Sequence, residues 1–420
     1  MTSTSVAYTY SEGGRAGDRL ALSLMLVSVA NSISMALVPV TQNQLQDQFG
    51  LSGAQIGLLT SLFWLAFGLG SIPAGVAVAR WGGRTLIVGV AVAALGAAVF
   101  AASSSYAGFL TGRLLQGLGG ATIIPVTNHL LTHYVVPGRQ ARALGIFGSG
   151  HGVGVIAALL ILPSVQSAGG YRASFFLNAG ITVALALMAV LQGPVRAPVQ
   201  AHSREASMSA TLRDVGAVAT NRRLIQLAVI NVGVMAVVVG ILAWTPAFLQ
   251  DQRGAGPAVA AYLTAAVGLA QLLGNIAGAA AMARWGKPFV LLSGMAVMLV
   301  STALAPIVPG AGLAIAFVII SGFMTMALFP AILGSVPDIV PRAAQVGSAS
   351  GFLNLTNLLG SLLAPWVFGM LVDQYGATSG QNGYLAGYLW LALFPFVGTF
   401  AGVAYMRGRR RDVKRTQKDR

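Results

Sequence analysis

The chain has 420 residues, of which 56% are hydrophobic and only 8% are charged, and its mean hydropathy is +0.76. A soluble fold cannot bury that much apolar side chain, so we expect an integral membrane protein with lipid as the solvent for most of its surface. A net charge of +15 could indicate nucleic-acid binding, but the cations lie in short gaps between apolar runs, a pattern that excludes this partner.

Apolar runs long enough for one helical crossing each follow one another along the chain. Residues 1–19 are polar and lack a small-residue cleavage site, which predicts a cytoplasmic tail and not a signal peptide. Twelve transmembrane helices are predicted, over residues 20–42, 54–79, 85–104, 107–132, 142–165, 172–193, 223–249, 257–283, 288–308, 311–335, 343–372 and 384–406. The expected fold class is an all-α membrane protein with two six-helix bundles, and its domains are an N-terminal tail (1–19), a first bundle (20–193), a cytoplasmic linker (194–222), a second bundle (223–406) and a basic cytoplasmic tail (407–420).

The Lys and Arg residues are distributed unevenly between the two predicted membrane faces. One face carries 22 of the 25, while the other carries only Arg172 and Arg253. The positive-inside rule therefore predicts that both termini are cytoplasmic, in a bacterial inner membrane. We interpret the run Arg409–Arg411 as an orientation signal, with contact to anionic membrane lipids as the alternative.

An internal repeat occurs at a fixed offset of 204 residues. Gln46-Asp47-Gln48 matches Gln250-Asp251-Gln252, and Arg80-Trp81-Gly82 matches Arg284-Trp285-Gly286. Because this offset spans six crossings, an even number, the two halves have the same orientation in the membrane. Parallel repeats of this kind rock about a site at their shared interface.

Several motifs resemble those of the major facilitator superfamily of transporters. The loop Gly75–Arg84, GVAVARWGGR, resembles the family signature Gly-x-x-x-Asp-Arg-x-Gly-Arg-Arg, with Ala79 in the place of the aspartate that latches the cytoplasmic gate. Arg113–Gly117 resembles the Arg-x-x-Gln-Gly motif, and Gly170–Phe176 resembles Gly-Trp-Arg-x-x-Phe. The resemblance implies the superfamily fold, and it assigns gating roles to Gly75, Arg80, Gly82, Arg84, Arg284 and Gly286.

Within the superfamily, the segments Ser61–Trp64 and Ile72–Gly75 resemble those of organic-anion and nitrate-type porters. Drug exporters share several of these features. The exporter motif Gly-Pro-x-x-Gly-Gly is not intact, because Gly148, Gly150 and Gly152 lack the Gly-Pro pair. This weighs against proton-coupled drug efflux.

Ionisable residues at mid-membrane depth are few. All ten carboxylates are predicted outside the spans, with Asp47, Asp251 and Asp373 in external loops. Arg113 and His151 remain, and each has a structural alternative: Arg113 could hydrogen-bond neighbouring helices or present a fixed charge to an anion, and His151 could bond another helix or line the pathway. No cysteine or metal-ligand cluster is present, so neither a metal nor a cofactor is expected.

Further polar residues are predicted at similar depth, and their distribution over helices that line the cavity in this superfamily favours a polar central site. With Arg113 and His151, the predicted substrate-binding residues are Asn31, Trp64, Gln116, Asn231, Gln271, Asn354 and Asn357. Each of them could equally hydrogen-bond between helices.

The leading hypothesis is a secondary active transporter, and not an enzyme, that moves a small organic or inorganic anion by alternating access. It would work as a monomer, with gradients or exchange as the energy source and protons as a candidate coupling ion. The alternatives are efflux of drugs or hydrophobic metabolites and, more remotely, a non-transporting membrane receptor.

Overall fold

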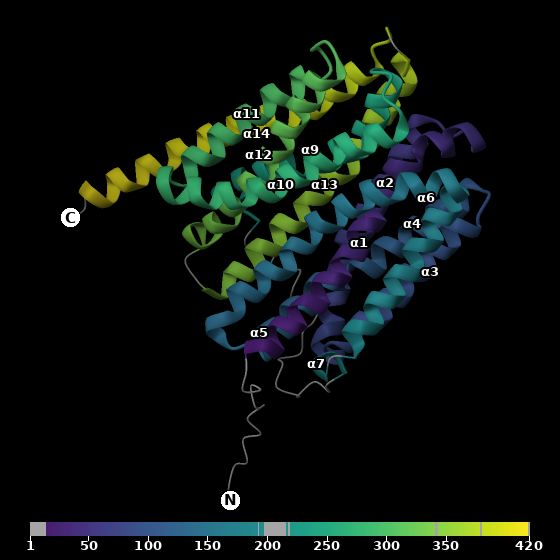
Figure 1. Cartoon of the computed structure of the whole chain (residues 1–420). Helices are drawn as coiled ribbons and strands as arrows, with labels where there is room; N and C mark the ends of the chain where they lie inside the picture. Colours follow the sequence, from purple (N-terminus) through teal and green to yellow (C-terminus); the bar gives the residue numbers. More distant parts are fainter. Residues whose placement is uncertain are drawn as a thin grey trace, which may run out of the picture.

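The computed structural model describes residues 14–191, 193–196, 216, 219–340, 343–378 and 380–418, almost all of them helical. The first half contains α1 (Gly14–Phe49), α2 (Gly53–Trp81), α3 (Arg84–Ala102), α4 (Tyr106–Gly120), α5 (Ile123–Tyr134), the 3-10 turn η1 (Pro137–Arg139), α6 (Gln140–Val190) and α7 (Gly193–Arg196). The second half contains α9 (Arg222–Asp251), α10 (Pro257–Trp285), α11 (Lys287–Leu304), α12 (Ala311–Ile339), α13 (Ala343–Tyr375) and α14 (Gly383–Lys418). Figure 1 shows the two halves as separate bundles, purple to teal and green to yellow.

The predicted fold class is confirmed, although three crossings are built differently from the prediction. Ten helices within the described ranges are long and apolar enough to span a membrane. One of them, α6, would be about 77 Å long if it were straight, more than twice the ~30 Å hydrocarbon core. It bends at Gly170, whose φ of 69° is accessible to glycine, so its two arms form two crossings. The helices α4 and α5 are separated only by Ala121 and Thr122, and together they form the fourth crossing.

Small residues allow the helices of each bundle to approach closely. Helices in lipid gain little from apolar burial against one another, so close van der Waals contact must hold them together. At the α3–α4 contact, a Cβ atom at Gly112 would lie 2.8 Å from the carbonyl oxygen of Gly96 and 2.8 Å from the Cβ of Phe100. Any side chain at position 112 would therefore push α3 and α4 apart.

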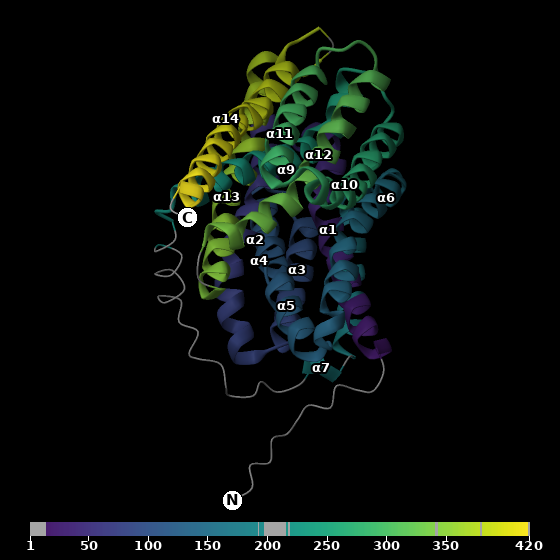
Figure 2. The same ribbon diagram turned by 90° about the vertical axis from the view of Figure 1, so that its left-hand side faces the viewer.

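The two bundles meet along two helix pairs, α2 with α13 and α6 with α10, which lie on opposite sides of the molecule in Figure 2. We call the end at which α1 ends and α2 begins the distal end. The α2–α13 contact extends from Gly53 and Gly369 at the distal end to Gly68 and Leu358 near the middle of the helices. Further toward the other end, a Cβ atom at Gly75 would have no neighbour within 4 Å.

The polar segments are only partly described. Arg204 and Arg213 of the predicted linker lie outside the described residues. The last helix, α14, continues beyond the predicted span to Lys418 and projects past its neighbours in Figure 1. Most of the predicted basic tail is therefore helical.

Glycine packing yields a testable pair of substitutions. We expect Gly112→Ala to lower the free energy of unfolding by about 1–3 kcal/mol, because its methyl group overlaps α3. Gly180→Ala should raise it by up to about 1 kcal/mol, because a Cβ there meets nothing within 4 Å and alanine favours helix. Thermal unfolding of the two purified variants measures the difference, and equal midpoints would contradict the packing argument.

Candidate functional site

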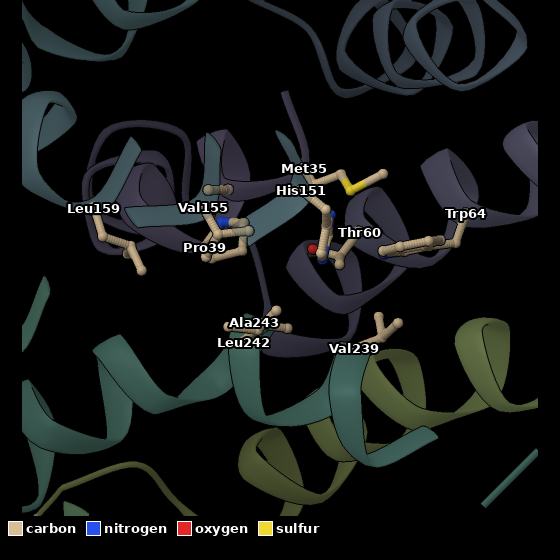
Figure 3. Close-up of a pocket in the computed structure, with 11 residues that line it drawn as sticks. Met35, Pro39, Thr60, Trp64, His151, Val155, Leu159, Val239, Leu242 and Ala243 are labelled. Carbon is tan, nitrogen blue, oxygen red and sulfur yellow. The ribbon is translucent and has the colours of Figure 1, made fainter. Parts of the chain in front are cut away.

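A narrow pocket of about 20 Å³ lies between the two halves. Its walls come from α1, α2, the first arm of α6, and α9: Met35, Ala36, Pro39, Thr60, Trp64, His151, Val155, Leu159, Val239, Leu242 and Ala243. In Figure 3 the side chains of Thr60, Trp64 and His151 lie on one side of the pocket, while Val239, Leu242 and Ala243 of α9 face them from the other. The first half thus supplies the polar groups, and the second half supplies an apolar wall.

His151 is oriented by a hydrogen bond to α1. Its Nδ1 lies 3.1 Å from Ser32 Oγ, which itself donates to the carbonyl oxygen of Ser28 at 3.0 Å. A serine hydroxyl has only one proton, so Nδ1 must be the donor to Ser32. The neutral ring then keeps Nε2 as an acceptor, and protonation would convert Nε2 into a donor suited to an anion.

Arg113 is fully buried and held by three helices of the first bundle. Its Nε donates to the carbonyl oxygen of Leu59 at 3.1 Å, and its Nη1 donates at 2.9 Å to both Ser34 O and Gln116 Oε1. The guanidinium also lies 4.5 Å from the ring centroid of Phe63. Its Nη2 and the Nε2 of Gln116 are buried donors without a hydrogen-bond partner in the described structure. Arg113 and Gln116 are therefore together, but outside the lining of the pocket.

The other predicted substrate-binding residues are dispersed. Trp64 lines the pocket with His151, whereas Asn31 lies against Gly120. Asn231 donates to the carbonyl oxygen of Leu353 inside the second bundle, and both amide atoms of the buried Gln271 lack a partner among the described residues.

Asn354 and Asn357 lie on α13. Asn354 is exposed one turn before Leu358, and Asn357 is half-buried with an unpartnered Oδ1 in the described structure. The structure thus brings two of the nine predicted residues into the pocket.

Carboxylates link the two halves at the distal end. Asp373 at the end of α13 accepts the backbone N–H of Gly53 at 2.5 Å and that of Ala54 at 2.8 Å. These are free N–H groups in the first turn of α2, at the positive end of its dipole.

Asp251 makes a second link between the halves. It accepts one hydrogen bond from Nδ2 of Asn43 at 3.2 Å and another from the hydroxyl of Tyr384 at 2.5 Å. We call Asp373, Gly53, Ala54, Asp251 and Asn43 the distal latch.

The predicted gating residues surround the repeated Arg-Trp-Gly loops at the other end. Gly82 and Gly286 end α2 and α10 with φ of 57° and 80°, conformations that L side chains rarely adopt. Arg84 Nε donates to the carbonyl oxygen of Arg196, while Arg80 and Arg284 are exposed and Gly75 faces open space.

The carboxylates of the described spans lie at helix ends. This agrees with the prediction that no carboxylate lies at mid-membrane depth. Asp18, Asp47, Asp251, Asp338 and Asp373 all fall in the first or last two turns of their helices. The three residues predicted in external loops belong instead to the last turns of α1, α9 and α13, because these helices continue past the apolar runs.

Sequence reasoning missed the apolar wall of α9, the Ser32 partner of His151 and the distal latch. Ser32 and His151 are 119 positions apart, and Gly53 and Asp373 are 320 apart, so no local pattern connects them. The Ser52-Gly53 start of α2 carries a capping box that marks a helix N-terminus, but this signal does not identify a partner.

Two pseudo-equivalent six-helix bundles with a pocket between them define a membrane carrier of the alternating-access class. The sequence profile of the Major Facilitator Superfamily matches residues 20–269 and 248–420, and the chain belongs to this family of transporters.

One relative, the hexuronate transporter of Bacillus subtilis (strain 168), is 24% identical over 403 residues, covering 91% of this chain and 94% of the relative. The tetracenomycin C resistance and export protein of Streptomyces glaucescens is 31% identical, but over only 43% of this chain and 34% of its own. Among solved structures, a bacterial homologue of the human lysosomal transporter Spinster, inward-facing and occupied, superposes with a TM-score of 0.78 at 19% identity, covering 92% of this chain and 96% of that one.

The distal latch makes a prediction about conformation. The chain has no cysteine, so Ser61→Cys, at a buried α2–α13 position, can report opening of the distal end by its rate of reaction with a maleimide. Charge-assisted hydrogen bonds are each worth about 1.5–3 kcal/mol, so Asp373→Asn should accelerate this reaction roughly ten-fold or more. Asp47→Asn is the matched control: Asp47 is an exposed carboxylate at the same end that makes no hydrogen bond or ion pair with the other half in the described structure, and its charge repels that of Asp251, so its removal should not accelerate the reaction. Equal acceleration by both substitutions would argue against the latch.

Proposed function

We propose that this transporter carries a small organic anion of the sugar-acid class through the pocket around His151, which widens from the narrow form described here to admit the solute. The observation that carries the proposal is the pocket itself: a histidine with a fixed orientation, Thr60 and Trp64 face an apolar wall across the junction of the two halves. A relative that aligns over nearly the whole chain is a hexuronate transporter, and a hexuronate combines a carboxylate with a polar ring.

The two walls of the pocket suit this class of solute. A carboxylate can accept a hydrogen bond from protonated His151, and the Thr60 hydroxyl can bond a substrate oxygen. The indole ring of Trp64 offers an apolar face to a sugar ring. Arg113 lies in the same bundle and adds a fixed positive charge, since no carboxylate among the described residues neutralises it. In this proposal Arg113 raises the affinity for anions without touching them.

Export of a hydrophobic metabolite is the alternative, and the apolar residues of α1, α6 and α9 in the pocket favour it. The partial alignment with the tetracenomycin exporter agrees with this alternative. The two functions differ in the charge and direction of the solute, which a transport assay distinguishes.

We also propose an orientation and an oligomeric state. The distribution of Lys and Arg supports cytoplasmic termini in a bacterial inner membrane, with the distal end outside. The pocket and both repeats belong to one chain, which supports transport by a monomer.

The substrate class is tested by counterflow in proteoliposomes loaded with unlabelled hexuronate. We expect uptake of labelled hexuronate that other sugar acids inhibit and that neutral hexoses and cationic drugs do not. Trp64→Ala should reduce uptake at least ten-fold, because it removes the ring that contacts the sugar. Inhibition by hydrophobic cations in place of sugar acids would support export instead.

The variant His151→Asn tests whether this histidine couples transport to protons. His151 is the one ionisable side chain among the described residues that line the pocket, so it is the candidate proton carrier. We expect His151→Asn to abolish accumulation driven by a pH gradient while preserving counterflow exchange. His133→Asn, which changes an exposed histidine at the end of α5, is the control. Full gradient-driven accumulation by the His151 variant would rule out this residue as the coupling group.

A further inference from the structure

An apolar groove of about 470 Å³ runs between α10 and α11 of the second bundle, with α12 as its floor. Small side chains of α10, including Ala277, Ala280 and Ala281, form one wall. Val297 of α11 lies in the other wall, and Phe323 and Met324 of α12 line the floor. The groove is open to the surroundings and separate from the pocket around His151.

One end of the groove carries an unneutralised positive charge. Arg284 and Trp285 line it, and the guanidinium carbon lies 5.6 Å from the ring centroid of Trp285. The neighbouring Lys287 is already paired with Asp338 at 3.0 Å. Arg284 is exposed and has no carboxylate partner among the residues that the structure describes. It therefore has donors available for an anion from outside the protein.

The groove reaches from headgroup depth into the hydrocarbon. From Arg284 to Ala277 the helix rises about 10 Å, roughly a third of the ~30 Å core. Beside the groove, Ile276 is 66% exposed and Val300 is 54% exposed. Large exposed apolar side chains on a membrane-spanning helix identify a face in contact with lipid.

We propose that this groove binds an anionic phospholipid, with its phosphate on Arg284 and one acyl chain against α12. Such a lipid has an anionic phosphate at headgroup depth, where Arg284 lies, and an apolar acyl chain in the hydrocarbon, where the rest of the groove lies. Arginine suits the phosphate because its guanidinium can donate two parallel hydrogen bonds. Tryptophan is typical of the membrane interface, where its ring lies at the level of the headgroups.

Quenching of tryptophan fluorescence by brominated lipids tests the proposal. The intact protein is reconstituted in phosphatidylcholine vesicles that contain a fixed fraction of dibrominated phosphatidylglycerol or dibrominated phosphatidylcholine. The contribution of Trp285 is the difference between the parent protein and Trp285→Phe. We expect phosphatidylglycerol to bind beside Trp285 about five-fold more strongly than phosphatidylcholine, the effect of one cation at a membrane surface.

Four variants make this test specific. Arg284→Ala should reduce the preference to about one, and Arg284→Lys should keep most of it. Arg80→Ala removes the repeat-related arginine outside the groove and should change nothing. Ala280→Phe fills the groove and should reduce quenching by both lipids.

Equal quenching by the two lipids in the parent protein would overturn the proposal, as would a preference that survives Arg284→Ala. Absence of quenching by both lipids, together with cross-linked dimers, would show that a second copy covers the groove. Because no solute is present, none of these results depends on the identity of the transported substrate.

Discussion

The hydrocarbon core of the membrane is the constraint on which the rest of this structure depends. It requires every backbone polar group to be bonded within its own helix, and it makes an uncompensated charge at mid-depth costly. The carboxylates of the described spans accordingly lie in the end turns of their helices. Arg113, the buried exception among the cations whose burial the structure describes, is surrounded by carbonyl oxygens, an amide oxygen and an aromatic ring. Its positive charge is thereby solvated within one bundle and moves with that bundle.

Composition and periodicity were sufficient to predict the fold, because lipid imposes one length and one polarity on each crossing. The exceptions are local interruptions of single crossings or of the loop between two crossings. At Gly170 a single glycine replaces the predicted loop, and at Ala121 and Thr122 the fourth crossing is interrupted without a charged residue or a proline at the break. For the candidate site, polarity at mid-depth was the available signal, and it led to His151 and Trp64. It could not separate them from Gln116 or Asn231, because polar groups between helices give the same pattern as polar groups that face a cavity.

The two ends of the carrier are held by different chemistry. At the repeated loops Ala79 occupies the place of the signature aspartate, so the carboxylate contact typical of the family is missing from that position. At the distal end Asp373 binds the first turn of α2, and Asp251 binds Asn43. The distal contacts stabilise the conformation seen here, with the distal end closed. A bound solute must therefore supply enough differential binding energy to separate α2 from α13.

A pocket without a fixed carboxylate also constrains how coupling could work in the proposed mechanism. With His151 neutral, the empty pocket carries no net charge, so the bundles can close around it without burying an unpaired ion. A bound anion would add one negative charge, which a proton on Nε2 of His151 would neutralise. The pocket is therefore neutral in two states: empty with neutral His151, and anion-bound with protonated His151. Both states can undergo the conformational change that moves the pocket from one membrane face to the other. An anion beside neutral His151, or an empty pocket with protonated His151, would bury an uncompensated charge. Such a carrier would move the proton and the anion together, because closure is least costly when the charges in the pocket cancel.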